Sequence, residues 1–306
     1  MVNELSDRPL VSVAILTWNR RPHVLKAIES VFQQTYRPVE VVVVDSASTD
    51  GTVDAVHAAY PSVKVIRLHR NLGCPEGRNV ALANCSGEVL YALDDDGWLA
   101  ENTVQNVIDC FRRHPKAGVV CCRIVPPGVR IESSGVDEVQ HTFTGGASAF
   151  RKEILHTAGF YPSDFFRQAE EGDLALRVIE AGYTIVHSPT AIMFHAIVPL
   201  NRANKLFWYY GCRNELTTVL RRYPWALVLP VAVQKVGVWV GLGLTQGALI
   251  HTLRGIWHVM TRWPQVLRER EPVSMTTVRE VFRLKMAMKR KLWASPQNPH
   301  CHHQPQ

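Results

Sequence analysis

Short apolar runs alternate with segments of helical character along the first hundred residues. Each apolar run is rich in β-branched residues and ends in polar ones, which predicts buried strands. The segments between them predict helices, with the helical spacing clearest just after the first run. Strands are expected at 10–17, 39–45, 63–68 and 87–93, and helices at 22–34, 53–60 and 77–84. This alternation predicts an α/β fold whose mostly parallel sheet has helices on both faces.

Polar residues cluster where three of these strands end. Thr17 to Asn19 follow the first strand, Asp45 ends the second, and Asp94 to Asp96 follow the fourth. In sheets of this kind, ligands bind beyond the carboxyl ends of the strands. We therefore expect the three clusters to meet at one edge of the sheet and to form a binding site there.

The run Asp94-Asp95-Asp96 places three carboxylates side by side. Like charges at short range repel and raise one another's pKa, and a divalent cation removes that cost. Two carboxylates with phosphate oxygens and waters are the usual ligands of Mg²⁺, and Mn²⁺ accepts the same oxygen-rich set. Side chains alternate along an extended chain, so Asp94 and Asp96 are expected to face the metal and Asp95 to point away.

The regular alternation ends after the acidic run. Between 118 and 146 the pattern is typical of loops or a hairpin, with Pro126-Pro127-Gly128 in its middle. Helices are predicted near 151–158 and at 170–181, followed by a short strand at 183–186. The sheet-containing body is expected to end between 195 and 200.

The chain from residue 201 onward has a different character. Residues 225–250 are mostly apolar and long enough to span a bilayer, since about 20 apolar residues suffice. Lys235, two glutamines and four glycines interrupt this segment, while arginines and tryptophans flank it as interfacial anchors do. Membrane association is favoured over a helical bundle packed on the main domain, and the choice between a span and a surface helix stays open. The tail 295–306 is predicted to be disordered.

Composition narrows the functional classes. The 46% hydrophobic residues are typical of an ordered globular protein, and the net charge of +7 suits anionic partners such as nucleotides or lipid phosphates. No nucleic-acid-binding module is recognisable, so no nucleic-acid partner is expected. Seven cysteines without a paired framework favour a reducing compartment. Met1 to Leu10 lack an apolar core, so no signal peptide and a cytoplasmic location are expected.

Several motifs resemble, in order and spacing, those of the family 2 inverting glycosyltransferases with a GT-A fold. They are VSVAILTWNR at 11–20, VDSASTDGT at 44–52, NLGCPEGRN at 71–79, LDDD at 93–96, GGASAF at 145–150, EEGDLALR at 170–177, AGY at 181–183 and His195. The resemblance covers about residues 10 to 200, and the rest resembles the hydrophobic extension of rhamnosyltransferase-like members. It implies a GT-A catalytic domain at 1–200, a helical membrane-associating extension at 201–294 and a tail at 295–306.

The resemblance also implies a role for individual residues. The implied donor-binding residues are Thr17, Asn19, Asp45, Arg78, Asn79 and Asp94, and the implied ligands of Mg²⁺ or Mn²⁺ are Asp94, Asp96 and His195. Asp45 is expected near the base. The family's acidic pair before the Asp-Leu helix usually ends in Asp, the general base, whereas this chain has Glu170-Glu171. Glu171 takes the place of the base, the choice between Glu170 and Glu171 stays open, and Asp173 is expected to support the start of the helix.

The resemblance implies an inverting transfer of a sugar from a nucleotide-diphosphate donor to an acceptor hydroxyl. The hydrophobic extension favours a lipid-linked or cell-envelope glycan as the acceptor, at the inner face of the cell membrane. One alternative is a haloacid-dehalogenase-like phosphatase that uses Asp94 as its nucleophile, although its Asp-x-Asp motif would follow the first strand. The other is a non-catalytic, membrane-associated scaffold that binds the donor.

Overall fold

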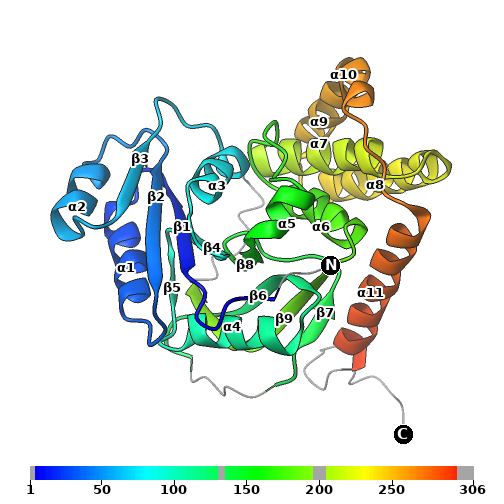
Figure 1. Ribbon diagram of the computed structural model, residues 1–306. Helices are drawn as coiled ribbons and strands as arrows, with labels where there is room; N and C mark the ends of the chain where they lie inside the picture. Colours follow the sequence, from blue (N-terminus) through cyan, green and yellow to red (C-terminus); the bar gives the residue numbers. More distant parts are fainter. Residues whose placement is uncertain (1–3, 130–134, 196–204, 295–306) are drawn as a thin grey trace, which may run out of the picture.

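The computed structural model describes residues 4–129, 135–195 and 205–294 (Figure 1). The strands are β1 Val11–Thr17, β2 Val39–Asp45, β3 Lys64–Arg67, β4 Val89–Asp94, β5 Gly97–Leu99, β6 Ala117–Val125, β7 Glu138–Gln140, β8 Ala147–Arg151 and β9 Thr184–His195. The helices of the sheet-containing part are α1 Arg21–Phe32, α2 Thr52–Ala59, α3 Cys74–Ala83, α4 Thr103–Arg113, α5 Lys152–Thr157 and α6 Glu170–Glu180. The remaining helices are α7 Lys205–Arg222, α8 Trp225–Thr245, α9 Leu249–Thr261, α10 Trp263–Arg268 and α11 Met275–Ala294.

The sheet has the order β3-β2-β1-β4-β8-β6-β9-β5, with β7 paired to β9. Its first half is parallel, and the register pairs Thr17 with Asp45 and Leu16 with Asp94. The carboxyl ends of β1, β2 and β4 therefore lie level at one edge. Strand β8 is antiparallel to both β4 and β6, so the sheet is mixed. The predicted α/β fold with a mixed, mostly parallel sheet is confirmed.

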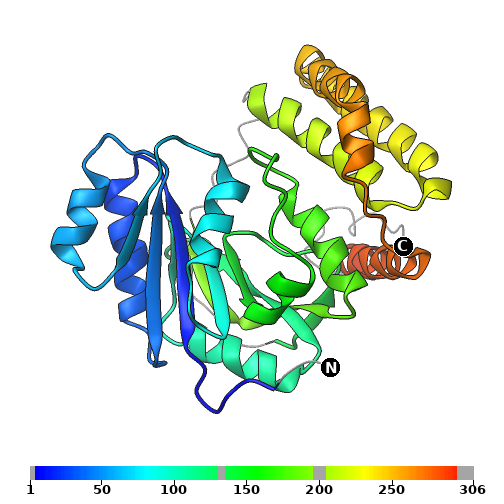
Figure 2. The ribbon, with the colours of Figure 1, turned by 45° about the horizontal axis from the view of Figure 1, so that its top comes forward.

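Helices cover the sheet on both faces, as the alternation predicts. One core cluster combines β-strand residues with side chains of α1 and α4, including Ile28 and Phe111. The other combines strand residues with side chains of α3, α5 and α6, including Leu82, Ile154 and Leu174. Figure 2 shows the two helical layers from a second direction. Strands β1, β2 and β4 of the parallel half are thus largely buried on both sides, which accounts for their mainly apolar sequences, whereas the edge strand β3 is only partly buried.

Two predictions for the second half of the domain were incomplete. The segment 118–146, expected to form loops or a hairpin, contains most of β6, a nine-residue strand that pairs with the distant strands β8 and β9. The strand expected at 183–186 is the start of β9, which extends to His195. Both strands are stabilised by pairing with segments distant in the sequence, and the local pattern around Pro126 carries no sign of that pairing.

The C-terminal helices form a bundle with its own core. Trp208 and Cys212 of α7 pack against Trp239 of α8 in a third hydrophobic cluster. The apolar run 225–250 is divided between two helices, because the chain turns at Gly247, where φ is +65°. Among the described residues, α8 is the one helix whose length and composition would allow it to cross a membrane, and 11% of its most apolar window is buried. The predicted boundary near 200 and the predicted disordered tail lie outside the described residues.

Candidate active site

The acidic run lies in a tight turn at the sheet edge. Strand β4 ends at Asp94, Asp95 and Asp96 form the turn, and β5 begins at Gly97. The three carboxylates therefore do not lie on an extended chain, as was predicted, because the chain reverses direction at the turn and β5 pairs with β9. Asp94 and Asp96 nevertheless approach one another, while Asp95 is buried and accepts a hydrogen bond from Thr17 Oγ1 at 2.8 Å.

Two arginines neutralise much of this acidic charge. Arg78 Nη2 lies 2.5 Å from Asp94 Oδ1, and Arg20 contacts both Asp95, at 3.2 Å, and Asp96. Burial raises the pKa of Asp95 to about 6. Burial acts in the same direction on Asp96, but the neighbouring Arg20 and His195 hold the pKa of that carboxyl below its usual range. The repulsion that the sequence analysis assigned to a metal is thus already offset in part by Arg20 and Arg78.

His195 comes to the acidic turn from the end of β9. The register pairs it with Gly97, and its Nε2 lies 3.0 Å from Asp96 Oδ1. One ligand atom each from Asp94, Asp96 and His195 lie within 4.8 Å of one another. Each carboxylate has lone pairs beyond those used by the arginines, so two oxygens and one nitrogen remain able to hold Mg²⁺ or Mn²⁺. The residues implied as metal ligands therefore fit such an ion.

Two glycines keep space open for these carboxylates. A Cβ on Gly146 would lie 1.9 Å from Asp94 Cγ, and a Cβ on Gly145 would lie 2.8 Å from Glu171 Oε1. Both distances are far below van der Waals contact. Gly145 also donates its backbone N–H to Glu171 Oε1 at 3.2 Å. The pair Gly145-Gly146 thus fits closely against the carboxylate of Asp94 and orients Glu171.

The two glutamates at the start of α6 have different surroundings. Glu170 is buried, its Oε1 lies 3.4 Å from Arg78 Nη1, and its Oε2 has no hydrogen-bond partner among the described residues. Burial and repulsion from Glu171 raise the pKa of Glu170 to about 7. Glu171 is more exposed and lines a large cavity. Of the two, Glu171 is the carboxylate that a molecule in the cavity can contact.

The segment before these glutamates is held in a strained conformation. Gln168 and Ala169 have φ values of 68° and 63°, a left-handed region that non-glycine residues rarely adopt. Asn214 of α7, fully buried, donates hydrogen bonds to the carbonyls of Arg167 at 2.8 Å and Gln168 at 2.7 Å. The C-terminal helices therefore fix the backbone that presents Glu170 and Glu171.

Arginines of α7 extend this attachment. Arg221 pairs with Asp164 at 2.9 Å, and Arg222 pairs with the fully buried Asp173 at 2.9 Å. Asp173 also pairs with Arg177 at 2.8 Å, so its carboxylate is held by two arginines, and its expected support of the start of α6 stays a prediction. Sequence reasoning identified none of the α7 contacts, because nothing in the local pattern relates α7 to the acidic pair.

The residues implied to bind the nucleoside occupy the ends of β1 and β2. Asp45 is fully buried; its Oδ2 accepts a hydrogen bond from the Ser48 N–H at 2.9 Å, and its Oδ1 has no partner among the described residues. Asn19 Oδ1 accepts from the Thr49 N–H at 2.8 Å. An unpartnered buried carboxylate oxygen is costly unless a ligand donates to it, so Asp45 Oδ1 is suited to a base N–H.

Arg20 and Asn79 differ from what the motifs suggested. Arg20 had no predicted role, although it directly follows Asn19 just beyond the end of β1, a position from which its guanidinium reaches the acidic turn. The amide of Asn79 is committed to the backbone of Tyr161, donating to its carbonyl at 2.9 Å and accepting from its N–H at 3.0 Å. Asn79 therefore anchors a loop, and its part in framing the donor stays a prediction.

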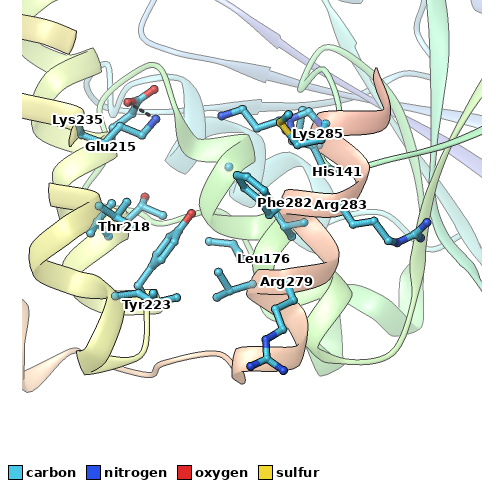
Figure 3. A pocket seen from close by; sticks show the side chains of 18 of the residues that line it. His141, Leu176, Glu215, Thr218, Tyr223, Lys235, Arg279, Phe282, Arg283 and Lys285 are labelled. Atoms are coloured by element: carbon cyan, nitrogen blue, oxygen red, sulfur yellow. Dashed lines mark ion pairs between the residues drawn. The ribbon is translucent and has the colours of Figure 1, made fainter. Parts of the chain in front are cut away.

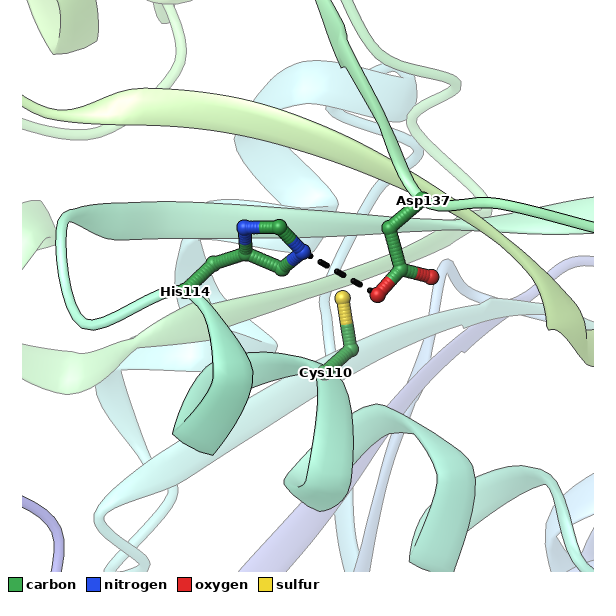
Figure 4. Close-up of side chains that lie close together, drawn as sticks. All are labelled: Cys110, His114 and Asp137. Carbon is green, nitrogen blue, oxygen red and sulfur yellow. Dashed lines mark hydrogen bonds and ion pairs between the residues drawn. The ribbon is translucent and has the colours of Figure 1, made fainter.

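A second group of potential ligands lies far along the sheet (Figure 4). Cys110, His114 and Asp137 also place ligand atoms within 4.8 Å of one another. Burial raises the pKa of the Cys110 thiol to about 12, and Arg113 already pairs with Asp137 at 2.7 Å. A metal needs the thiolate and a free carboxylate, so this group is better explained as a hydrogen-bonded cluster that ties α4 to the segment before β7.

Comparison with known proteins gives a consistent result. Residues 12–167 match the model of the glycosyl transferase family 2. An uncharacterized glycosyltransferase of Haemophilus influenzae is 31% identical over 205 residues, which cover 61% of this chain and 69% of that protein. An N-acetylglucosaminyl-diphospho-decaprenol L-rhamnosyltransferase of Mycobacterium tuberculosis is 25% identical over 233 residues, covering 61% and 76%.

Solved structures share the fold. The mannosyltransferase PcManGT of Pyrobaculum calidifontis, solved with GDP-Man and Mn²⁺, aligns with a TM-score of 0.58 at 20% identity and covers 97% of this chain and 84% of that one. GalNAc-T7, solved with UDP, GalNAc and Mn²⁺, aligns with a TM-score of 0.60 at 15% identity and covers 72% and 49%. At these identities the likeness is one of fold.

Proposed function

This chain belongs to glycosyl transferase family 2, and we propose that it transfers a sugar from a nucleotide-diphosphate donor to an acceptor hydroxyl with inversion at the anomeric carbon. The observation that carries the proposal is the convergence of ligand atoms of Asp94, Asp96 and His195, within 4.8 Å. They meet at the edge where Asp45 Oδ1 has no partner in the described part of the chain. Two structures of the same fold solved with Mn²⁺, one with GDP-Man and the other with UDP and GalNAc, support the same assignment.

In this proposal the residues divide the reaction between them. Thr17, Asn19 and Asp45 hold the nucleoside, and Arg20 and Arg78 face the diphosphate, where their charges offset those of the phosphates. Asp94, Asp96 and His195 hold Mg²⁺ or Mn²⁺, which when bound offsets the charge of the leaving diphosphate.

Glu171 is the proposed general base. Its carboxylate accepts the proton of the acceptor hydroxyl while that oxygen forms a bond to the anomeric carbon and the bond to the diphosphate oxygen breaks. The Gly145 N–H orients Glu171 Oε1, and Glu171 lines a cavity large enough for an acceptor. Glu170 is the less suitable of the pair, because it is buried against Arg78. Direct displacement inverts the anomeric configuration and needs no carboxylate nucleophile.

A membrane-bound acceptor is the second part of the proposal. The relatives include an enzyme named for a decaprenol diphosphate and, in Haloferax volcanii, one named for a dolichyl phosphate. The outer faces of α8 and α9 expose large apolar side chains such as Leu229, Val233 and Trp257, which suits a membrane surface. We place the protein at the inner face of the cell membrane. The double variant Leu229→Ser with Val233→Ser should co-sediment less with vesicles. Unchanged co-sedimentation would contradict the proposed membrane association.

Both alternatives are less well supported. The phosphatase alternative needs Asp94 free as a nucleophile, whereas Asp94 pairs with Arg78 and packs against Gly146. The match of residues 12–167 to glycosyl transferase family 2 also favours sugar transfer over the phosphatase reaction. The scaffold alternative needs a missing metal or base position, and each of these positions holds a suitable side chain.

Calorimetric binding of a panel of nucleotide sugars, with and without Mn²⁺, tests the proposal. One donor should bind in a metal-dependent way, and Asp96→Ala should abolish that dependence. Asp109→Ala, which removes a partly exposed carboxylate of α4, is the matched control and should bind normally. Glu171→Gln should bind the donor but fail to transfer the sugar. Binding of no donor, or equal binding by Asp96→Ala, would contradict the assignment.

A further inference from the structure

A large cavity lies between the C-terminal helices and the catalytic domain (Figure 3). Its volume is about 1240 Å³, and α6, α7, α8 and α11 contribute its walls. Typical sites for small ligands hold roughly 300–1000 Å³, so this one suits a larger molecule. Ala169, Glu171 and Gly172 form part of its lining. The cavity therefore connects the proposed general base with the surface of α11.

The middle of the cavity is apolar. Apolar side chains from four helices, and Tyr223 from the turn between α7 and α8, line it, namely Leu176, Val219, Tyr223, Leu227, Val231 and Phe282. Phe282 is 65% exposed and points into the space between α11 and the other helices (Figure 3). An apolar wall of this extent, open at one side, suits a hydrocarbon chain.

The rim of the cavity carries an excess of positive charge. Among the described residues, Arg279, Lys285, Lys289 and Arg290 line the cavity and form no ion pair, whereas Lys235 pairs with Glu215 at 2.7 Å. Desolvation and the nearby charges of Lys235 and Lys289 lower the pKa of Lys285. Lysines crowded in this way are stabilised by an anion between them.

Buried polar atoms in the same cavity also lack partners. His141 Nδ1 and Thr218 Oγ1 are buried and make no hydrogen bond within the part of the chain that the structure describes. His141 and Lys285 lie together on one wall, opposite the Lys235–Glu215 pair (Figure 3). A ligand with hydrogen-bonding oxygens would satisfy these groups, which a purely apolar occupant would not.

We propose that this cavity binds the acceptor through its lipid carrier, an amphiphile with a long hydrocarbon chain and a phosphate or diphosphate headgroup. The chain lies against Phe282 and its apolar neighbours, the headgroup lies between Lys285 and His141, and the sugar hydroxyl reaches Glu171. The proposal rests on the proposed glycosyltransferase function. The lining contributed by Glu171 favours an acceptor over a bilayer phospholipid, which has no reason to approach the base.

Calorimetry with farnesyl diphosphate and the full-length protein tests this site without any donor. With EDTA present, farnesyl diphosphate should bind, while farnesol and inorganic diphosphate, each with half of the required features, should bind at least about tenfold more weakly. Lys285→Gln should weaken binding about tenfold. Lys291→Gln is the matched control, because Lys291 lies on the same helix but pairs with Glu138 instead of lining the cavity.

The outcomes separate this inference from the proposed function. Equal binding by Lys285→Gln and wild type, or no binding of farnesyl diphosphate, would overturn the inference, as would its displacement by soluble dihexanoylphosphatidylglycerol at equal concentration. Asp96→Ala should bind farnesyl diphosphate normally, because the metal residues are not part of the cavity lining. Loss of all nucleotide-sugar binding with farnesyl diphosphate binding intact would instead remove the proposed transfer reaction.

Discussion

Replacing Glu170 by glutamine is expected to stabilise the protein at alkaline pH. Burial and the charge of Glu171 raise the pKa of Glu170 from 4.5 to about 7. Because the folded state holds this proton more tightly than the unfolded state, the free energy of unfolding falls as the pH rises from about 4.5 to about 7, and then levels off. One pKa unit corresponds to about 1.4 kcal/mol, so the ionised carboxylate costs about 3 kcal/mol above pH 7. A glutamine has the shape of the protonated form without that cost.

Urea unfolding of the full chain at pH 4.5 and pH 8.5, in EDTA, measures this effect. Glu170→Gln should exceed the wild type by about 3 kcal/mol at pH 8.5 and by less than about 0.5 kcal/mol at pH 4.5. Glu29→Gln, on the exposed face of α1, is the control and should stay within about 0.5 kcal/mol at both pH values. A gain that does not depend on pH, or a loss at pH 8.5, would refute the reasoning.

Two further substitutions probe the support of the site. Gly146→Ala places a methyl group against the carboxylate of Asp94, so the Mn²⁺ affinity measured by titration is expected to fall about 10- to 100-fold. Gly172→Ala is the control, because its Cβ meets nothing within 4 Å, and it should leave the Mn²⁺ affinity unchanged. Asn214→Ala leaves two carbonyls of the strained segment without donors, so the free energy of unfolding measured in urea should fall by about 2–4 kcal/mol. The variant should also lower kcat more than it raises KM. A normal kcat would show that the segment keeps its conformation without the hydrogen bonds from α7.

The first half of the fold was predictable because its signal is local. Strand β2 has the bounds expected from its run of valines, and β1, β3 and β4 differ by one or two residues. The clustering of Thr17, Asp45 and Asp94 followed from strand order alone, since parallel strands end at the same edge. Strand β6 was missed because its stability comes from β8 and β9, which no short-range pattern indicates.

The residues of the site were predictable where they belong to a sequence motif, and they were missed where segments distant in the sequence come together. Asp94, Asp96 and His195 come together as the resemblance implied, while their roles, and those of Glu170 and Glu171, stay predictions. The role of Arg20 was missed because only the turn between β4 and β5 brings two carboxylates to it. The contribution of Asn214 depends on the packing of α7 against the segment before α6, and the sequence had placed α7 in an extension separate from the catalytic domain.

The arginines of α7 limit how this chain can be truncated or recombined. Arg222 bridges Asp173 at the start of α6 and Glu271 just before α11, so three segments share one guanidinium. A shortened chain that ends near residue 204 would leave Asp173 with half of its counter-charge and release the backbone before Glu170. If such a fragment were inactive, the cause could be displacement of the proposed base as well as loss of membrane association. Likewise, chimeras that exchange the C-terminal helices between relatives need matching partners for Arg221, Arg222 and Asn214 before they can test acceptor choice.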